Sequence, residues 1–177
     1  MTREVPLSLL IRQHLALKQE FARRHPFAWL VWEAGAWSLP ALVDGNVART
    51  NLPLDDDDLR DCLPLGDVLC FELLLSQPGT LRLGRAEAND VVIHDATVSR
   101  EHALLTRDAT GHWGAEAAPG HSVKLGDEDV PAGSLRSLAQ GDRLGLGEIV
   151  LTFYDAESLL ARVKDEGLRL LASVTEG

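Results

Sequence analysis

The sequence of 177 residues has no long hydrophobic run. No stretch approaches the roughly 18 consecutive apolar residues that a membrane-spanning helix needs. The first apolar run, near the start of the chain, is brief and soon meets Arg12 and Lys18. We therefore expect neither a membrane span nor a secretion signal, and the cytoplasm is the expected location.

Cysteine and basic residues are also scarce. The two cysteines, Cys62 and Cys70, form no CxxC pair and have no paired histidines nearby, so we expect no metal site and two reduced thiols. Lysine and arginine total 17 against 27 aspartates and glutamates, which gives a formal net charge of -10. This charge repels nucleic acid and anionic membranes, so neither is an expected partner and any anion site must be local.

The sequence patterns of common catalytic sites are missing too. There is no Gly-x-Ser-x-Gly elbow, no Gly-rich phosphate loop with a lysine, and no histidine placed to activate either cysteine. A run of four aspartates at 55–58 leaves a cation site open, but it lacks the alternate spacing and the internal glycine of an EF-hand loop. We therefore expect a protein that is not an enzyme and has no cofactor.

Residues 1–65 are expected to form an extension of a helix, a strand unit and a linker. Apolar residues at helical spacing predict a helix over 7–25, which Pro26 ends. This helix either packs on the rest of the chain or docks a partner. Residues 38–65 are rich in proline, glycine and aspartate, which favours an exposed linker.

The segment 27–37 between that helix and the linker contains three of the four tryptophans. Its large side chains alternate, which predicts a strand with a turn at Ala34-Gly35. We expect the tryptophans to pack in a core or between domains, with stacking on a ligand as the alternative. They are Trp29, Trp32 and Trp37.

From Asp67 to Asp155 the sequence changes to short apolar runs separated by turn signals. This pattern is typical of an all-β sandwich, so residues 66–155 are expected to form one domain. After Asp155, apolar residues return to helical spacing. They predict a C-terminal helix over 156–177 with Asp155 as its N-cap.

Four fragments of the sandwich region stand in an order that is hard to obtain by accident. They are Gly84-Arg85, Asn-Asp-Val-Val-Ile at 89–93, Val-Ser-Arg-Glu-His-Ala at 98–103, and Leu-Ala-Gln-Gly-Asp-Arg-Leu-Gly-Leu-Gly at 138–147. Together they resemble the forkhead-associated (FHA) domain, over about half of the chain. The resemblance implies a mainly β fold, an eleven-stranded β-sandwich whose loops at one end bind a phosphothreonine peptide without catalysing a reaction.

The resemblance also implies roles for particular residues. Arg85 would contact the phosphate, Ser99 would donate its hydroxyl, and Arg100 would occupy an adjoining contact position. Gly84 would give the backbone freedom to present Arg85, and His102 would brace the loop through hydrogen bonds. A phosphate dianion needs charge-assisted donors on a rigid frame, and these residue types supply them.

Each contact residue also has a plainer interpretation. Arg85 could pair with a nearby acid such as Glu87 or Asp90. Ser99 could only end a turn, and Arg100 could merely be solvated.

One loop departs from the family pattern. Two asparagines that the family typically carries there are replaced by Gly120 and Leu125 in this chain. His121 and Ser122 could supply substitute donors, so Gly120, His121 and Ser122 complete the expected phosphopeptide-binding set. Because each lost neutral hydrogen bond subtracts only about 1 kcal/mol, we expect phosphate recognition with weak or altered sequence preference.

The expected function is therefore a phosphothreonine-peptide-binding module that joins proteins downstream of a Ser/Thr kinase. Its partner would be a threonine-phosphorylated protein, either such a kinase or its substrate. The alternative is a phosphorylation-independent FHA-like scaffold, which the missing asparagines favour. Self-association is a further hypothesis, because phosphorylation of Thr50 on the predicted linker would create a ligand of this class. The excess of arginine over lysine hints at a bacterial source.

Overall fold

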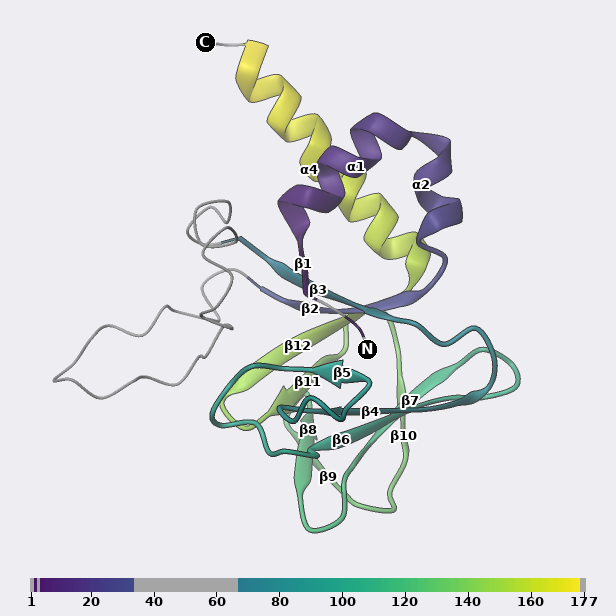
Figure 1. Ribbon diagram of the computed structural model, residues 1–177, viewed down its shortest axis with the longest axis vertical. Coiled ribbons are helices and arrows are strands. Elements are labelled where there is room, and N and C mark those ends of the chain that lie inside the picture. Colours follow the sequence, from purple (N-terminus) through teal and green to yellow (C-terminus); the bar gives the residue numbers. More distant parts are fainter. Residues whose placement is uncertain (1, 3, 34–66, 176–177) are drawn as a thin grey trace, which may run out of the picture.

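The structure is a computed structural model that describes residues 2, 4–33 and 67–175 (Figure 1). Twelve strands and three helices lie within these residues. In chain order they are β1 (Glu4–Pro6), α1 (Leu7–Leu17), α2 (Gln19–Arg24), β2 (Ala28–Trp32), β3 (Leu69–Leu73), β4 (Gly79–Gly84), β5 (Val91–Val92), β6 (Ala103–Arg107), β7 (Trp113–Ala117), β8 (Ser122–Leu125), β9 (Glu128–Pro131), β10 (Arg136–Leu138), β11 (Arg143–Leu146), β12 (Ile149–Tyr154) and α4 (Ala156–Thr175).

The strands form two sheets, which confirms the predicted mainly β sandwich. One sheet has seven strands in the order β1-β3-β2-β12-β11-β8-β9, and the other has five in the order β10-β7-β6-β4-β5. Apolar side chains from the facing sides of both sheets fill the core between them. Twelve strands are described rather than the predicted eleven: β3 to β12 lie within residues 66–155, and β1 and β2 come from the predicted extension.

Strand β2 lies inside the larger sheet, between β3 and β12. All five of its residues are buried, because its two faces pack against different layers. Leu30 and Trp32 belong to the core between the sheets, whereas Trp29 and Val31 belong to a second apolar cluster under the helices. The core packing predicted for Trp29 and Trp32 is therefore confirmed, while Trp37 lies outside the described residues.

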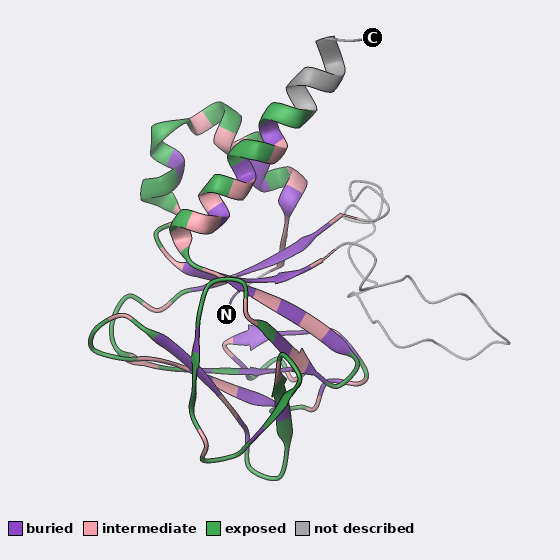
Figure 2. Cartoon of the chain, turned by 180° about the vertical axis from the view of Figure 1, so that it is seen from behind, coloured by how far each residue is buried: buried purple, intermediate pink, exposed green. Residues whose placement is uncertain are grey.

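The second cluster joins the helices to the outer face of the larger sheet. Leu10 and Phe21 of the N-terminal helices pack there with Leu159 and Val163 of α4. Figure 2 shows the helices stacked on one side of the sandwich, with their exposed residues turned outward. The helices cover the part of the sheet made by β1, β3, β2 and β12, since the cluster draws its strand residues from these elements. The part made by β11, β8 and β9 contributes none of the cluster's residues.

The predicted helix over 7–25 is wrong in one respect, because the chain breaks at Lys18. Lys18 has φ of 50°, a left-handed conformation, and it separates α1 from α2. After this break Phe21 stacks on His25, and His25 in turn stacks on Trp29, with ring centroids 4.7 and 5.7 Å apart. The break thus lets α2 close onto the start of β2.

The C-terminal helix begins where the sequence predicts. The backbone N–H of Ser158 donates to Oδ1 of Asp155 at 2.7 Å, which is the N-cap contact expected of Asp155. Arg162 then donates to both carboxylate oxygens of Glu33, at 2.6 and 2.8 Å, and to the Tyr154 hydroxyl at 3.1 Å. This bidentate ion pair fastens α4 to the chain just after β2.

Residues that the sequence assigned to the extension thus supply two strands, β1 and β2, of the larger sheet. The predicted linker, with its acidic run, Thr50 and Cys62, lies outside the described residues. Cys70 on β3 is buried and carries a free thiol. No helix in the described part of the chain has both the length and the apolar character needed to cross a membrane.

Candidate functional site

Three loops meet at one end of the sandwich: the β4–β5 loop (85–90), the β5–β6 loop (93–102) and the β7–β8 loop (118–121). Backbone hydrogen bonds join the first two, because the N–H groups of Arg85 and Ala86 donate to the carbonyls of Ser99 and Arg100 at 3.0 and 3.1 Å. Ala118 N–H donates to the His102 carbonyl at 2.9 Å and joins the third loop to the second. The predicted residues therefore stand on a connected backbone frame.

Gly84, the last residue of β4, is needed because two loops approach each other closely. A Cβ added there would overlap the carbonyl oxygen of Arg100 and lie 2.9 Å from that of Ser99. Its φ is outside the left-handed region. The predicted reason for Gly84 was backbone freedom, and the structure corrects it to a lack of space for a side chain.

The side chain of Asn89 connects the same two loops, the β4–β5 loop and the β5–β6 loop, by hydrogen bonds. Its side chain is buried, and its amide nitrogen donates to the carbonyls of Ala86 and Arg100 at 2.8 and 2.6 Å. This residue was quoted in the sequence analysis only as part of a motif and received no role. Its position shortly after Gly84-Arg85, at the start of the Asn-Asp-Val-Val-Ile fragment, was the feature of the sequence that could have indicated this supporting role.

A second supporting group, around Asp95 and Thr97, was also missed. Oδ1 of Asp95 accepts hydrogen bonds from the Thr97 N–H at 2.7 Å and from the Thr97 hydroxyl at 2.5 Å. The Thr97 hydroxyl oxygen accepts in turn from the N–H of Glu148, in the β11–β12 turn, at 3.0 Å. The Asp-x-Thr spacing signals the local turn, but the contact with a turn 51 residues further along the chain leaves no local signal.

His102, the last residue before β6, connects two loops through its ring. The N–H of Ser99 can only donate, so Nδ1 of His102 accepts this bond at 3.0 Å and the ring proton lies on Nε2. Nε2 then donates to the carbonyl of Ser122 at 3.3 Å. Burial lowers the pKa of His102 and the nearby His121 lowers it further, although the bond to Ser122 acts in the opposite direction. His102 is therefore held as a neutral imidazole.

His121, at the tip of the β7–β8 loop, reaches back to the β5–β6 loop. Its Nδ1 lies 3.3 Å from Oγ of Ser99, and its ring is 5.7 Å from the ring of His102 at an angle of 30°. His121 is exposed, in contrast to His102. Next to it, Gly120 has φ of 82° and nothing within 4 Å of an added Cβ. The structure thus brings Ser99, His102 and His121 together and leaves space beside Gly120.

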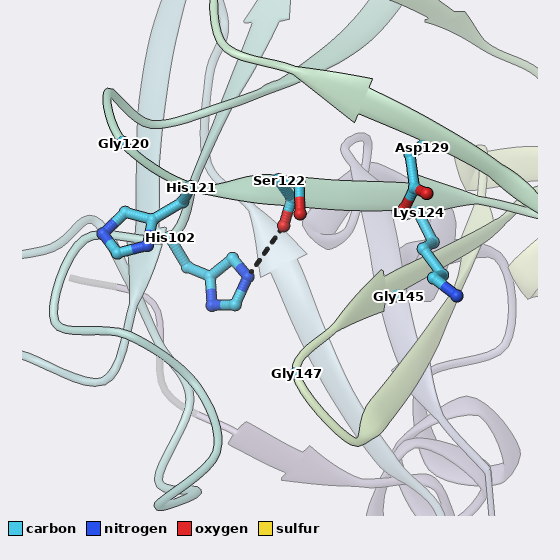
Figure 3. A pocket seen from close by; sticks show the side chains of 8 residues that line it. All are labelled: His102, Gly120, His121, Ser122, Lys124, Asp129, Gly145 and Gly147. Carbon is cyan, nitrogen blue, oxygen red and sulfur yellow. Dashed lines mark hydrogen bonds between the residues drawn. The ribbon is translucent and has the colours of Figure 1, made fainter.

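A hollow of about 350 Å³ opens beside these residues (Figure 3). The two histidines lie toward one end of it, and Lys124 and Asp129 lie further along β8 and β9. Its floor is the uncovered outer part of the larger sheet, where Gly145 of β11 adds no side chain. The residues that line the hollow are His102, Gly120, His121, Ser122, Lys124, Asp129, Gly145 and Gly147.

Arg85 and Arg100 are both exposed, and the ion pairs between described residues include neither of them. Asp90, the alternative partner weighed for Arg85, instead accepts a hydrogen bond from the Arg82 N–H at 2.8 Å and lies 3.7 Å from the Arg82 guanidinium. No carboxylate of the described residues therefore forms an ion pair with either guanidinium group, and the two arginines stand on adjoining loops. Within the described ranges, no three histidine, cysteine or acidic residues are grouped so that they could hold a metal ion.

The fold and the loop motif together define an FHA-type domain, and the chain carries one. The family model that matches is the cytoplasmic domain of the inner membrane component of T3SS, over residues 70–157, or about half of the chain. Domains of this type are interaction modules. None of the curated protein sequences matches this chain.

Several solved structures are similar in fold. An FHA domain of the CT664 protein from Chlamydia trachomatis is 15% identical, with 72% of this chain and 97% of that chain covered and a TM-score of 0.45. An FHA domain from Arabidopsis thaliana is 24% identical, with 51% and 75% covered and a TM-score of 0.42. Mycobacterium tuberculosis EmbR, in complex with a low-affinity phosphopeptide, is 27% identical, with 43% and 20% covered and a TM-score of 0.38.

Proposed function

We propose that the three loops bind a phosphothreonine-containing segment of a partner protein, and that the protein acts by binding rather than by catalysis. The observation that carries this proposal is the pair Arg85 and Arg100. Both guanidinium groups lack a carboxylate partner among the described residues, in a chain whose formal net charge is -10. Arginines that form no ion pair with a described carboxylate do not stabilise the fold through such pairs, although the chain is rich in acids. Two guanidinium groups on adjoining loops suit a doubly charged phosphate ester as ligand.

The surrounding frame supports the same ligand. The loop backbones are fixed to each other by the hydrogen bonds of Arg85 and Ala86, so the backbone that carries the two arginines needs little reorganisation to bind. Ser99 is only partly exposed, and its hydroxyl points to the side of the loop where His121 lies. In our proposal Arg85 and Ser99 contact the phosphate, Arg100 takes the adjoining position, and Gly120, His121 and Ser122 contact the peptide that carries it.

Calorimetry of the full chain with a degenerate phosphothreonine peptide mixture tests the proposal. We expect Arg85→Ala to weaken binding by at least tenfold, because a hydrogen bond to a charged group contributes about 1.5 to 3 kcal/mol. Arg143→Ala is the matched control, since Arg143 is also exposed but lies at the far end of β11 from the loops. Binding that is equally strong to the unphosphorylated mixture, or unchanged by Arg85→Ala, contradicts the proposal.

A phosphorylation-independent scaffold is the second candidate, and a specific observation favours it. Leu125, which stands where the family typically has an asparagine, is partly buried and packs against the core between the sheets. Gly120 has no side chain, so neither position can hold a peptide backbone through an amide. This candidate expects a partner from the native cell to be recovered equally with and without phosphatase treatment, and equally by Arg85→Ala.

The proposal also includes the enzyme that phosphorylates the partner. We infer a Ser/Thr kinase that modifies the partner, with the cytoplasm as the place where the two meet. Self-association through phosphorylated Thr50 stays a prediction, because that residue lies outside the described ranges. Mass spectrometry of protein from the native source checks it directly.

A further inference from the structure

His121 occupies the site in a way that the family pattern does not account for. It stands in a loop where the family typically carries neutral hydrogen-bonding side chains, and it contacts the serine that we assign to the phosphate. We propose that His121 is a third cationic donor to the phosphate, so that binding of a phosphothreonine peptide takes up a proton. This inference rests on the proposed function and adds a pH dependence to it.

The geometry places His121 within reach of the same anion as Ser99. Nδ1 of His121 is 3.3 Å from Oγ of Ser99, and a phosphate oxygen would lie about 2.7 Å from that hydroxyl when it accepts its proton. Such an oxygen adjoins the imidazole, and the exposed ring is free to turn toward it. A phosphate dianion has only acceptors, so Nδ1 must then carry a proton. Both the neutral ring with its proton on Nδ1 and the imidazolium satisfy this requirement, but only the imidazolium adds a positive charge, which a nearby dianion favours.

The neighbouring histidine does not compete for that proton. His102 is buried, and its Nδ1 is already occupied by the N–H of Ser99, so protonation there would break the loop's own hydrogen bond. The hydrogen bond to Ser122 holds the other ring nitrogen. The ring of His121 has neither constraint, because it is exposed and its hydrogen bond to Ser99 involves a hydroxyl that can act as donor or acceptor.

A bound phosphate would add the charge that favours the protonated ring. The charged residues of the adjoining loops are Arg85 and Arg100, and Lys124 and Asp129 line the hollow with His121. A bound dianion favours the charged form of an imidazole that lies within about 4 to 6 Å. Proton uptake is therefore linked to binding.

The test compares the wild-type chain with His121→Asn between pH 8 and pH 6, using the phosphothreonine peptide mixture as the probe. Asparagine keeps a neutral donor of similar reach but cannot become charged. We expect the wild type to bind about tenfold more tightly than the variant at pH 6 and within about threefold at pH 8, because only histidine can become a charged donor as the pH falls. Taking the ratio of the two affinities removes the titration of the phosphate itself, whose second pKa is about 6.

Calorimetry in two buffers of different ionisation enthalpy gives a second readout. At pH 7 the wild type should take up more protons on binding than His121→Asn does. His112→Asn is the control, because His112 is also exposed but lies in the β6–β7 turn, at the other end of β6 from the site. It should match the wild type in both affinity and proton uptake.

The outcomes separate this inference from the proposed function. A ratio that is the same at every pH, or equal proton uptake by the wild type and His121→Asn, overturns the inference and leaves phosphate binding in place. Failure of the wild type to bind the phosphorylated mixture at any pH overturns the proposed function instead. Because Gln at 121 would be equally neutral, His121→Gln should reproduce the behaviour of His121→Asn.

Discussion

The β5–β6 loop and the β7–β8 loop face the same site, but the protein holds them in different ways. The first has buried side chains at Ile93, Asp95, Val98 and His102, and hydrogen bonds fix it to β4, to the β4–β5 loop and to the β11–β12 turn. The second is exposed over 119–121. Its backbone contacts are one bond to His102 and one within the loop itself. One of the four fragments that resemble the FHA family, residues 98–103, lies in the first loop up to His102, whereas Gly120, one of the two departures, lies in the second.

This difference divides the site into two parts. We call the β4–β5 and β5–β6 loops, with Gly84, the frame, and the exposed β7–β8 loop the variable part. The frame residues are restricted by packing against other backbone, so few side chains are tolerated there whatever the ligand. The exposed loop is restricted only by the ligand, so its sequence is free to change with specificity. Substitutions in the two loops should therefore have effects of different kind and size.

The largest effect is expected at Gly84. Gly84→Ala should lower the free energy of unfolding by about 3 kcal/mol, because the added methyl group collides with backbone carbonyls of the β5–β6 loop that cannot easily move. Gly120→Ala, in the exposed loop, should cost only about 1 kcal/mol, from its positive φ alone. Guanidinium denaturation of both variants measures the difference. Equal losses at the two positions would show that the frame is less rigid than we describe.

A smaller loss is expected at Asn89. Asn89→Ala removes two hydrogen bonds from a buried side chain to loop carbonyls and should cost about 2 kcal/mol. Ser122→Ala is the comparison from the other side of the site, where the exposed hydroxyl should contribute within about 0.5 kcal/mol. The same denaturation experiment applies. A loss at Ser122 as large as that at Asn89 contradicts the division into a frame and a variable part.

The sequence predicted the frame better than the surroundings of the site. Gly84, Ser99 and His102 could be named from the sequence because they stand in short fragments that resemble a known family. The contact of Thr97 with the β11–β12 turn, and the place of β2 inside the larger sheet, depend on pairing between distant segments that no local pattern records. Leu125 looked like a lost ligand contact, but its packing against the core became visible only in the folded chain.

The pH dependence of stability sharpens the role of His102 within the frame. Because the pKa of His102 is lowered in the folded protein, chiefly by burial, the unfolded chain binds more protons near pH 6. The stability that neutral His102 gives is complete above the unfolded value of about 6.5 and is lost as the pH falls through the folded value. The free energy of unfolding should therefore drop between pH 7 and pH 5.

His102→Gln isolates this contribution. Glutamine keeps one acceptor and one donor for the two loops but does not titrate, so the drop in unfolding free energy should be smaller in the variant. His14, whose pKa burial and Lys164 also lower, contributes equally to both proteins and cancels in the difference. Urea denaturation at several pH values provides the measurement. A pH profile identical in the two proteins would mean that His102 is not held neutral by its surroundings.

The smallest expected change in binding is a gain in affinity for the peptide, and it comes from a substitution in the exposed β7–β8 loop. Gly120→Asn restores an amide that the FHA family typically carries, at a position with open space and a φ of 82° that asparagine tolerates better than other side chains. One new neutral hydrogen bond to the bound peptide should add about 1 kcal/mol, or roughly a fivefold gain in affinity for the phosphothreonine mixture. Gly120→Asp is the matched control, because its side chain has the same shape but no donor and repels the phosphate, so binding should weaken. If both variants bind alike, the exposed loop does not contact the peptide, and the site consists of the frame alone.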